Sequence, residues 1–242
     1  MRLALLSDIH ANLQAVEAVL ADVRHQKVSE IVSLGDIIGY GPQPEEVATL
    51  LLSEKIPSVM GNHEFALISR RYYKSLNPTA RTSIDITRQL MSEKTLRHVA
   101  TLPPFQTIEG CRCVHGCPPN SITRYLFNPS DERLHRLLSL FPERICFFGH
   151  THNLAIYAID GDGEIEKRRL VEERFVVREG QRCIINIGSV GQPRDGNNNA
   201  KYAIYDTSDA SVEIRFVPYD VEETKKRILA RGLPEFNARR LG

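Results

Sequence analysis

The chain has 242 residues, of which 42% are hydrophobic and 25% are charged, so it is long enough to bury a sizeable core of ordinary globular composition. Its formal net charge of +1 argues against a protein that binds long nucleic acid by bulk charge, and its five cysteines are too few for a disulfide framework. The sequence has no run of about 18 apolar residues that would predict a membrane span. We therefore expect a cytoplasmic enzyme or binding protein with no membrane partner.

The first third of the chain alternates short apolar runs with amphipathic helical patterns. Buried strands are predicted at residues 3–6, 30–34 and 56–60, and helices between them at residues 12–24 and 44–52. Strand–helix–strand units of this length predict parallel strands joined by right-handed crossovers. The opening segment should therefore form part of a parallel sheet.

The middle of the chain lacks strand patterns, and the remainder is rich in them. Helices are predicted at residues 79–90 and 93–100, which we interpret as a helical insertion over about residues 65–102 of a single domain spanning residues 1–242. A last helix is predicted at residues 221–230. The later strands are predicted at residues 112–115, 145–148, 154–159, 165–170, 183–187, 202–206 and 212–217.

Polar side chains that are good metal ligands follow several of these strands. They are Asp8, His10, Asp36, Asn62, His115, His150 and His152. The carboxyl ends of strands in an open α/β sheet border one crevice, so these side chains are expected to meet there. A mixed set of carboxylate, amide and imidazole donors suits Mn, Fe, Zn, Ni or Co better than Ca or Mg.

Each of these short segments has a simpler explanation when it is taken singly. An Asp-x-His segment is more often a solvated loop, a lone histidine such as His115 is more often a hydrogen-bonded core residue, and Gly35-Asp36 is more often a turn. The metal hypothesis depends on the joint pattern, in which every segment follows a strand. We therefore predict a metal site at the carboxyl ends of the strands.

The same segments give the sequence a resemblance to the calcineurin-like metallophosphoesterase superfamily, and within it to small bacterial and archaeal phosphodiesterases. The resemblance covers essentially the whole chain and implies a four-layer α/β/β/α sandwich. It is carried by Asp8-Ile9-His10, Gly35-Asp36, Gly61-Asn62-His63-Glu64, His115-Gly116, Gly149-His150-Thr151-His152 and Gly188-Ser189-Val190-Gly191-Gln192-Pro193.

The resemblance implies a site for two divalent metal ions, with Mn preferred and Fe, Zn, Ni or Co as alternatives. Asp8, His10 and His152 would hold one ion, Asn62, His115 and His150 the other, and Asp36 would bridge them. A hydroxide that bridges the metals would then hydrolyse a phosphodiester or phosphomonoester bond. The resemblance places His63 near the leaving group, where we assign it as general acid; the alternative is that it only orients Asn62.

The substrate itself is less well defined by the sequence. Arg194, Tyr40, Arg124 and Tyr125 are candidate substrate contacts, although solvated or rim positions explain each of them as well. We expect a small phosphate ester, with nucleotides among the candidates, and leave a homo-oligomer open. The alternative function from another class is a non-catalytic protein-binding scaffold with the metallophosphoesterase fold.

Overall fold

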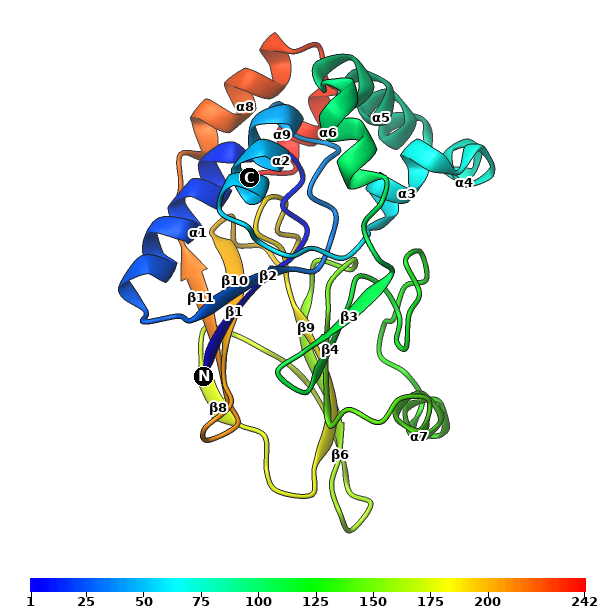
Figure 1. Ribbon diagram of the computed structural model, residues 1–242, viewed down its shortest axis with the longest axis vertical. Coiled ribbons are helices and arrows are strands. Elements are labelled where there is room, and N and C mark those ends of the chain that lie inside the picture. The colour runs from blue at the N-terminus through cyan, green and yellow to red at the C-terminus, as the bar shows by residue number, and fades with distance from the viewer.

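Two mixed β-sheets lie face to face, with helices on the outer side of each, in a computed structural model that describes all 242 residues (Figure 1). One sheet has the order β2 (Glu30–Ser33), β1 (Arg2–Leu6), β10 (Ala200–Asp206), β11 (Ser211–Val217) and β8 (Arg174–Val176). The other has the order β3 (Phe105–Ile108), β4 (Cys111–Val114), β5 (Ile145–Phe148), β9 (Arg182–Ile187), β6 (Leu154–Ile159) and β7 (Ile165–Arg169). This arrangement confirms the predicted four-layer sandwich.

The apolar residues of β1 show why the sheets stack in this way. Leu3 and Leu5 belong to the core between the sheets, whereas Ala4 and Leu6 belong to the core between the first sheet and its helices. Successive side chains of a strand point to opposite faces, so a strand that is covered on both faces must be apolar throughout. The continuous apolar run at the start of the sequence therefore marks a strand buried in the middle of the sandwich.

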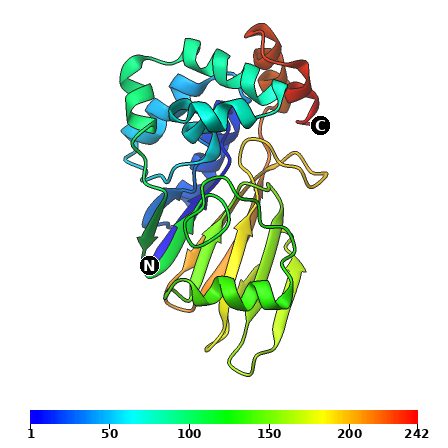
Figure 2. The same cartoon turned by 90° about the vertical axis from the view of Figure 1, so that its right-hand side faces the viewer.

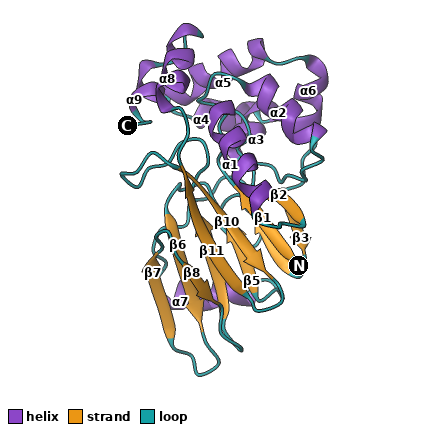
Figure 3. Cartoon of the chain, turned by 90° about the vertical axis from the view of Figure 1, so that its left-hand side faces the viewer, coloured by secondary structure: helices purple, strands orange, loops and turns teal.

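Helices cover the two outer faces unequally. The first sheet is covered by α1 (Leu13–His25) and α2 (Pro44–Ser53). Helix α8 (Val221–Ala230) packs against α1, and α9 (Glu235–Arg239) packs against α8. The outer face of the second sheet carries α7 (Asp131–Ser139), whose Leu134, Leu137 and Leu138 are buried against it (Figure 2). The other helices gather at one end of the strands (Figure 3). None of the helices has the length and apolar character needed to cross a bilayer.

The predicted helical segment is present and begins earlier than expected. It contains α3 (Asn62–Ile68), α4 (Arg70–Ser75), α5 (Pro78–Leu90) and α6 (Glu93–Val99). The side chain of Asn77 accepts a hydrogen bond from the backbone N–H of Ala80, and Pro78 occupies the first turn, so the start of α5 is fixed locally. The assignment of residues 1–242 to one domain stays a prediction.

The predicted strand at residues 56–60 is wrong. Only a single parallel bridge between Ser33 and Ser58 forms there, next to the edge strand β2. Pro57 has no N–H to donate, and the N–H of Met60 donates to the carbonyl of Pro103 rather than to β2. The chain then turns at Gly61 into α3, so this segment works as a connection that delivers Asn62.

Outside the helical insertion, four elements had not been predicted: β3, β8, α7 and α9. The two strands are short edges, and β8 contains only one half-buried residue between two exposed ones. Such strands form because a neighbouring strand offers free backbone groups, which the local sequence does not indicate. The C-terminal residues also fold back, since Leu241 is buried against Ile228 and Leu233.

Candidate metal centre

The loops after the strands bring all seven predicted ligands to one end of the sandwich. Backbone hydrogen bonds from Asp8 N–H to the carbonyl of Gly35 (3.0 Å) and from His10 N–H to the carbonyl of Asp36 (2.8 Å) tie the first two loops together. The backbone is left-handed at several non-glycine positions there, a conformation that is costly and that clusters at functional sites. These positions are Asp8 (φ 52°), His10 (φ 49°), Asp36 (φ 51°), His150 (φ 66°) and His152 (φ 59°).

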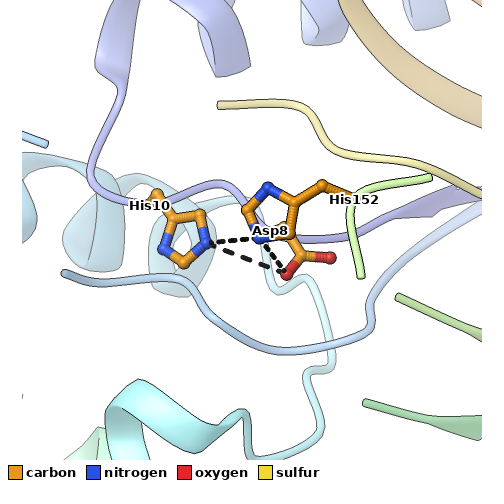
Figure 4. Close-up of side chains that lie close together, drawn as sticks. All are labelled: Asp8, His10 and His152. Carbon is orange, nitrogen blue, oxygen red and sulfur yellow. Dashed lines mark hydrogen bonds and ion pairs between the residues drawn. The ribbon is translucent and has the colours of Figure 1, made fainter. Parts of the chain in front are cut away.

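One group of donor atoms comes from Asp8, His10 and His152 (Figure 4). The Oδ1 atom of Asp8 lies 3.2 Å from Nε2 of His152 and 3.8 Å from Nε2 of His10, and the two imidazole nitrogens are 3.2 Å apart. The other carboxylate oxygen, Oδ2, accepts hydrogen bonds from the Ser7 hydroxyl (2.6 Å) and the His150 backbone N–H (2.9 Å). Oδ1 is buried and has no hydrogen-bond partner, so it is aimed into the group and free to bind a cation.

A second group centres on Asp36, His115 and His150. Nε2 of His115 lies 3.3 Å from Oδ2 of Asp36, 3.1 Å from Oδ1 of Asn62 and 3.1 Å from Nδ1 of His150. The same Oδ2 atom of Asp36 is 3.7 Å from Nε2 of His10, which belongs to the first group. Asp36 therefore lies between the two groups.

Backbone carbonyls orient the imidazoles in both groups. Nδ1 of His10 faces the carbonyl of Ile38 at 3.2 Å. In the same way, Nδ1 of His115 faces the carbonyl of Leu34 at 2.9 Å, and Nδ1 of His152 faces the carbonyl of Gln192 at 2.5 Å. Nε2 of His150 faces the carbonyl of Thr123 (3.2 Å). A carbonyl can only accept, so each outer nitrogen is the protonated one, and in a neutral ring the inner nitrogen presents a lone pair. Inner lone pairs that face one another at this distance fit a shared cation.

The charges of the site also favour a cation. Burial by itself would raise the pKa of Asp8 and Asp36, but the neighbouring imidazoles outweigh it and hold both pKa values well below the usual range. Burial, together with His115, lowers the pKa of His150 to about 3. Burial would also lower the pKa of His115, but the charge of Asp36 raises it to about 9. Two ionised carboxylates in a buried pocket thus attract positive charge, which either a proton on His115 or a bound cation can supply.

Comparisons with known proteins agree with this geometry. A family model described as the calcineurin-like phosphoesterase superfamily domain matches residues 1–210. The chain belongs to this superfamily. A metallophosphoesterase from Sphaerobacter thermophilus of known structure is 36% identical, with 100% of this chain and 98% of that chain covered and a TM-score of 0.84. Family membership and the His/Asp groups together support a metallophosphoesterase, and divalent metals are typical of the superfamily.

Two other proteins are similar to this phosphoesterase over nearly its whole length, but their names state no function. An uncharacterized protein of Methanocaldococcus jannaschii is 32% identical over 99% of this chain and 96% of its own length. A hypothetical protein from Pyrococcus horikoshii is only 17% identical, but its structure covers 99% of this chain and 97% of its own with a TM-score of 0.80, which shows the shared fold.

His63 lies at the centre and forms a third group of converging donor atoms with His10 and Asp36, residues that also belong to the two groups just described. Its ring is 2% exposed, and its Nε2 is 4.0 Å from Oδ2 of Asp36. Its backbone N–H donates to Oδ1 of Asp36 (2.9 Å), while its Nδ1 has no partner. Asn62 hydrogen-bonds to His115 and has no hydrogen bond to the His63 ring, so nothing in the geometry favours an orienting role of His63 toward Asn62.

The four candidate substrate contacts lie at different distances from the centre. The ring of Tyr40 lies 4.8 Å from that of His10 and 4.4 Å from that of His63, and the ring of Tyr125 stacks on His150 at 3.8 Å. Arg194 donates to the side chain of Gln192. Arg124 is exposed, and its guanidinium makes no hydrogen bond or ion pair, so the structure does not join it to the centre.

Glu64 is a buried positioning residue that sequence reasoning missed. Its carboxylate accepts hydrogen bonds from the backbone N–H groups of Gly61 (2.8 Å), Asp36 (2.9 Å) and Ile38 (3.1 Å). It thereby joins the loop that carries Asp36 to the start of α3, which carries Asn62. The bond from the N–H of Gly61 to Glu64, three residues later, is the glutamate half of a capping box, whereas Gly61 has no side chain to make the other half.

Proposed function

We propose that this protein is a dinuclear metal-dependent hydrolase of phosphodiester or phosphomonoester bonds. The observation that carries the proposal is that imidazole nitrogens and carboxylate oxygens from several loops converge on one buried region. The Nε2 atoms of His10 and His152, for example, lie only 3.2 Å apart. Neutral imidazoles this close would repel one another without a cation. Such a donor set is what a divalent transition metal requires.

The two groups define which residues would hold each ion. Asp8, His10 and His152 would bind one, His115, His150 and Asn62 the other, and Asp36 would reach both through its Oδ2 atom. Two divalent ions would supply positive charge that polarises the phosphoryl oxygens and lowers the pKa of water. We propose Mn as the native metal because imidazole and carboxylate donors are mixed here, with Fe, Zn, Ni and Co as alternatives.

His63 is proposed to act on the leaving group. Its buried ring borders the centre and is held there by the bond from its own backbone N–H to Asp36. Burial lowers the pKa of His63, and the charge of Asp36 opposes this effect. The neutral ring keeps one N–H, which can donate to the leaving oxygen and stabilise its developing negative charge, and the charge of Asp36 favours the imidazolium form that could also supply a proton.

A nucleotide is the small phosphate ester that we favour as substrate. Tyr125 stacks on His150 at the centre, and Phe127 stacks on Tyr125 with ring centroids 5.5 Å apart. The two aromatic residues are 49% and 54% exposed, respectively. An exposed aromatic face next to a phosphate site is a platform on which a nucleobase can stack.

The direct test is hydrolysis of bis(p-nitrophenyl) phosphate by purified protein with Mn, Ni, Co or Zn added in turn. We expect release of p-nitrophenolate that depends on the metal and is abolished by chelation. Asp36→Asn should reduce it strongly, because that side chain lies between both groups of donors. Absence of hydrolysis with all four metals would refute the proposal and favour a non-catalytic scaffold.

A further inference from the structure

Two arginines next to the centre share one neutral acceptor. Nη2 of Arg194 donates to Oε1 of Gln192 at 2.8 Å, and Nη1 of Arg240 approaches the same oxygen at 3.5 Å. No carboxylate lies within ion-pairing distance of either guanidinium, whereas the neighbouring Arg239 is 3.7 Å from Glu235. Two like charges side by side repel one another, and an anion between them would remove that repulsion.

The pair is attached to the residues of the metal centre. The backbone carbonyl of Gln192 is the acceptor that orients His152, at 2.5 Å from its Nδ1. Gln192, the acceptor of both arginines, also lines a small pocket together with Tyr40 and His10. The ring of Tyr40 is in turn 4.8 Å from that of His10. The arginines thus lie one side chain away from the proposed ligands.

Open space adjoins both guanidinium groups. A cavity of about 370 Å³ is lined by Arg194 and Arg240, together with Pro193, Asn197 and Asn198. Arg194 also borders a second cavity of about 440 Å³ that includes Asn153, the residue after His152. Both guanidinium groups are therefore accessible to a ligand from these cavities.

Buried contacts hold each arginine in place. The loop of Arg194 is fixed by Lys201, whose ammonium is 2.8 Å from Oδ1 of Asp195 and whose side chain is 1% exposed. The segment of Arg240 is fixed by the burial of Leu241 and by a hydrogen bond from the side-chain amide of Asn237 to the carbonyl of Tyr40 (2.9 Å). Anchored backbone segments thus keep the two like charges near one another, as a preorganised anion site requires.

We propose that Arg194 and Arg240 form a second anion subsite beside the metal centre, which binds a further phosphate group of the substrate. This inference rests on the proposed function, since the scissile phosphate is assigned to the metal groups. A guanidinium group can donate two parallel hydrogen bonds to the oxygens of one phosphate. The favoured substrate is therefore a phosphate ester that carries another phosphate close to the scissile one. The C-terminal segment, through Arg240, then selects the substrate.

Two chromogenic diesters that differ by one phosphate test the subsite. They are thymidine 5′-(p-nitrophenyl phosphate) and its 3′-phosphorylated analogue, which share the base and the leaving group. We expect a KM about tenfold lower for the 3′-phosphorylated diester. Arg240→Ala, Arg240→Gln and Arg194→Gln should each remove most of that preference. Arg239→Ala is the matched control, because Arg239 is exposed on the same segment and has its own partner, and it should keep the preference.

The outcomes separate the subsite from the proposed function. Hydrolysis of both diesters with no preference in the wild type, or with a preference that survives Arg240→Gln, overturns the subsite and leaves the function standing. Calorimetry gives a readout that needs no turnover: thymidine 3′,5′-bisphosphate should bind more tightly than thymidine 5′-monophosphate, and Arg240→Gln should weaken only the bisphosphate. Selective weakening of bisphosphate binding in a protein that hydrolyses neither diester would support the subsite and refute the proposed function. Equal weakening of bisphosphate and monophosphate binding would refute the subsite.

Discussion

Oδ1 of Asp8 lies 3.2 Å from Nε2 of His152, and it has no hydrogen-bond partner although it is buried. The two residues come from different sheets of the sandwich, since Asp8 follows β1 of one sheet and His152 follows β5 of the other. An orphaned carboxylate oxygen and an imidazole lone pair in contact are costly to bury without a compensating charge. A bound cation would relieve this cost.

Removal of single ligands should change the metal content of the protein in a residue-specific way. His152→Ala removes a donor of the first group, and His115→Ala removes one of the second, so each variant should retain about one metal per chain where the wild type holds two. Metal analysis of the purified proteins checks this. His98→Ala, at an exposed position of α6, is the control and should match the wild type. Equal metal content in all four proteins would contradict the assignment.

Loss of the His63 side chain should affect turnover and leave metal content intact. His63→Ala is expected to lower kcat by about 10²–10⁴-fold, because it removes a proton donor without removing a ligand. The backbone N–H of His63 that donates to Asp36 is kept in this variant. Steady-state kinetics with bis(p-nitrophenyl) phosphate and metal analysis of the same sample measure the two effects separately. An unchanged kcat would rule out the catalytic role.

Glu64 should support the centre through the backbone. In Glu64→Gln the new amide nitrogen faces N–H donors that it cannot accept from, so at least one buried N–H loses its partner, at a cost of about 1–3 kcal/mol. We expect a lower melting temperature and weaker metal binding, measured by thermal unfolding and metal titration. Glu17→Gln, on the exposed face of α1, should change neither. Wild-type stability and metal affinity in Glu64→Gln would show that the contacts are dispensable.

Tyr125 should matter for nucleoside esters in particular. Tyr125→Ala is expected to raise the KM of thymidine 5′-(p-nitrophenyl phosphate) about tenfold or more, since stacking of one base contributes about 1–3 kcal/mol. Tyr125→Phe keeps the ring and should behave like the wild type. Ethyl p-nitrophenyl phosphate has no base and serves as the control substrate, with an expected KM change that is much smaller. A similar increase for both substrates would instead indicate a disturbed His150, which packs against the same ring.

The acid stability of the fold should depend in part on Asp22, far from the centre. Its carboxylate accepts hydrogen bonds from Nε of Arg215 (2.7 Å) and the hydroxyl of Tyr202 (2.6 Å), and the bonds from Arg215 are the main cause of its lowered pKa. A depressed folded-state pKa stabilises the protein above the unfolded-state value, about pH 4, and this stabilisation is lost as the pH falls through the folded-state value. Asp22→Asn should therefore cost about 1 kcal/mol at neutral pH.

That difference between wild type and Asp22→Asn should shrink progressively below about pH 4. Denaturant unfolding at a series of pH values measures it. A difference that stays constant down to low pH would mean that the amide disturbs packing and that the charge of Asp22 is unimportant.

The sequence alone was sufficient for the fold class and the family, and it proposed the residues of the candidate centre. The reason is local: apart from Asn62, each proposed ligand follows an apolar strand, so adjacent residues such as Leu3 to Leu6 before Asp8 indicate its place at a strand end. Helix α5 was equally predictable, because Asn77 and Pro78 form its start without help from distant residues. Patterns that are complete within one segment can be recognised before the chain is folded.

Only the tertiary structure decided which of these residues meet and what surrounds them. The short edge strand β8 and the failed strand before Gly61 depend on whether a neighbour's backbone groups are free. The contacts of Asp8 with His152, and of Arg240 with Gln192, join loops that are distant in the chain. Arg239 and Arg240 are indistinguishable in the sequence, and the packing of Leu241 turns only one of them toward the centre. Non-local contacts of this kind arise from how the sheets and helices stack, and no single segment encodes them.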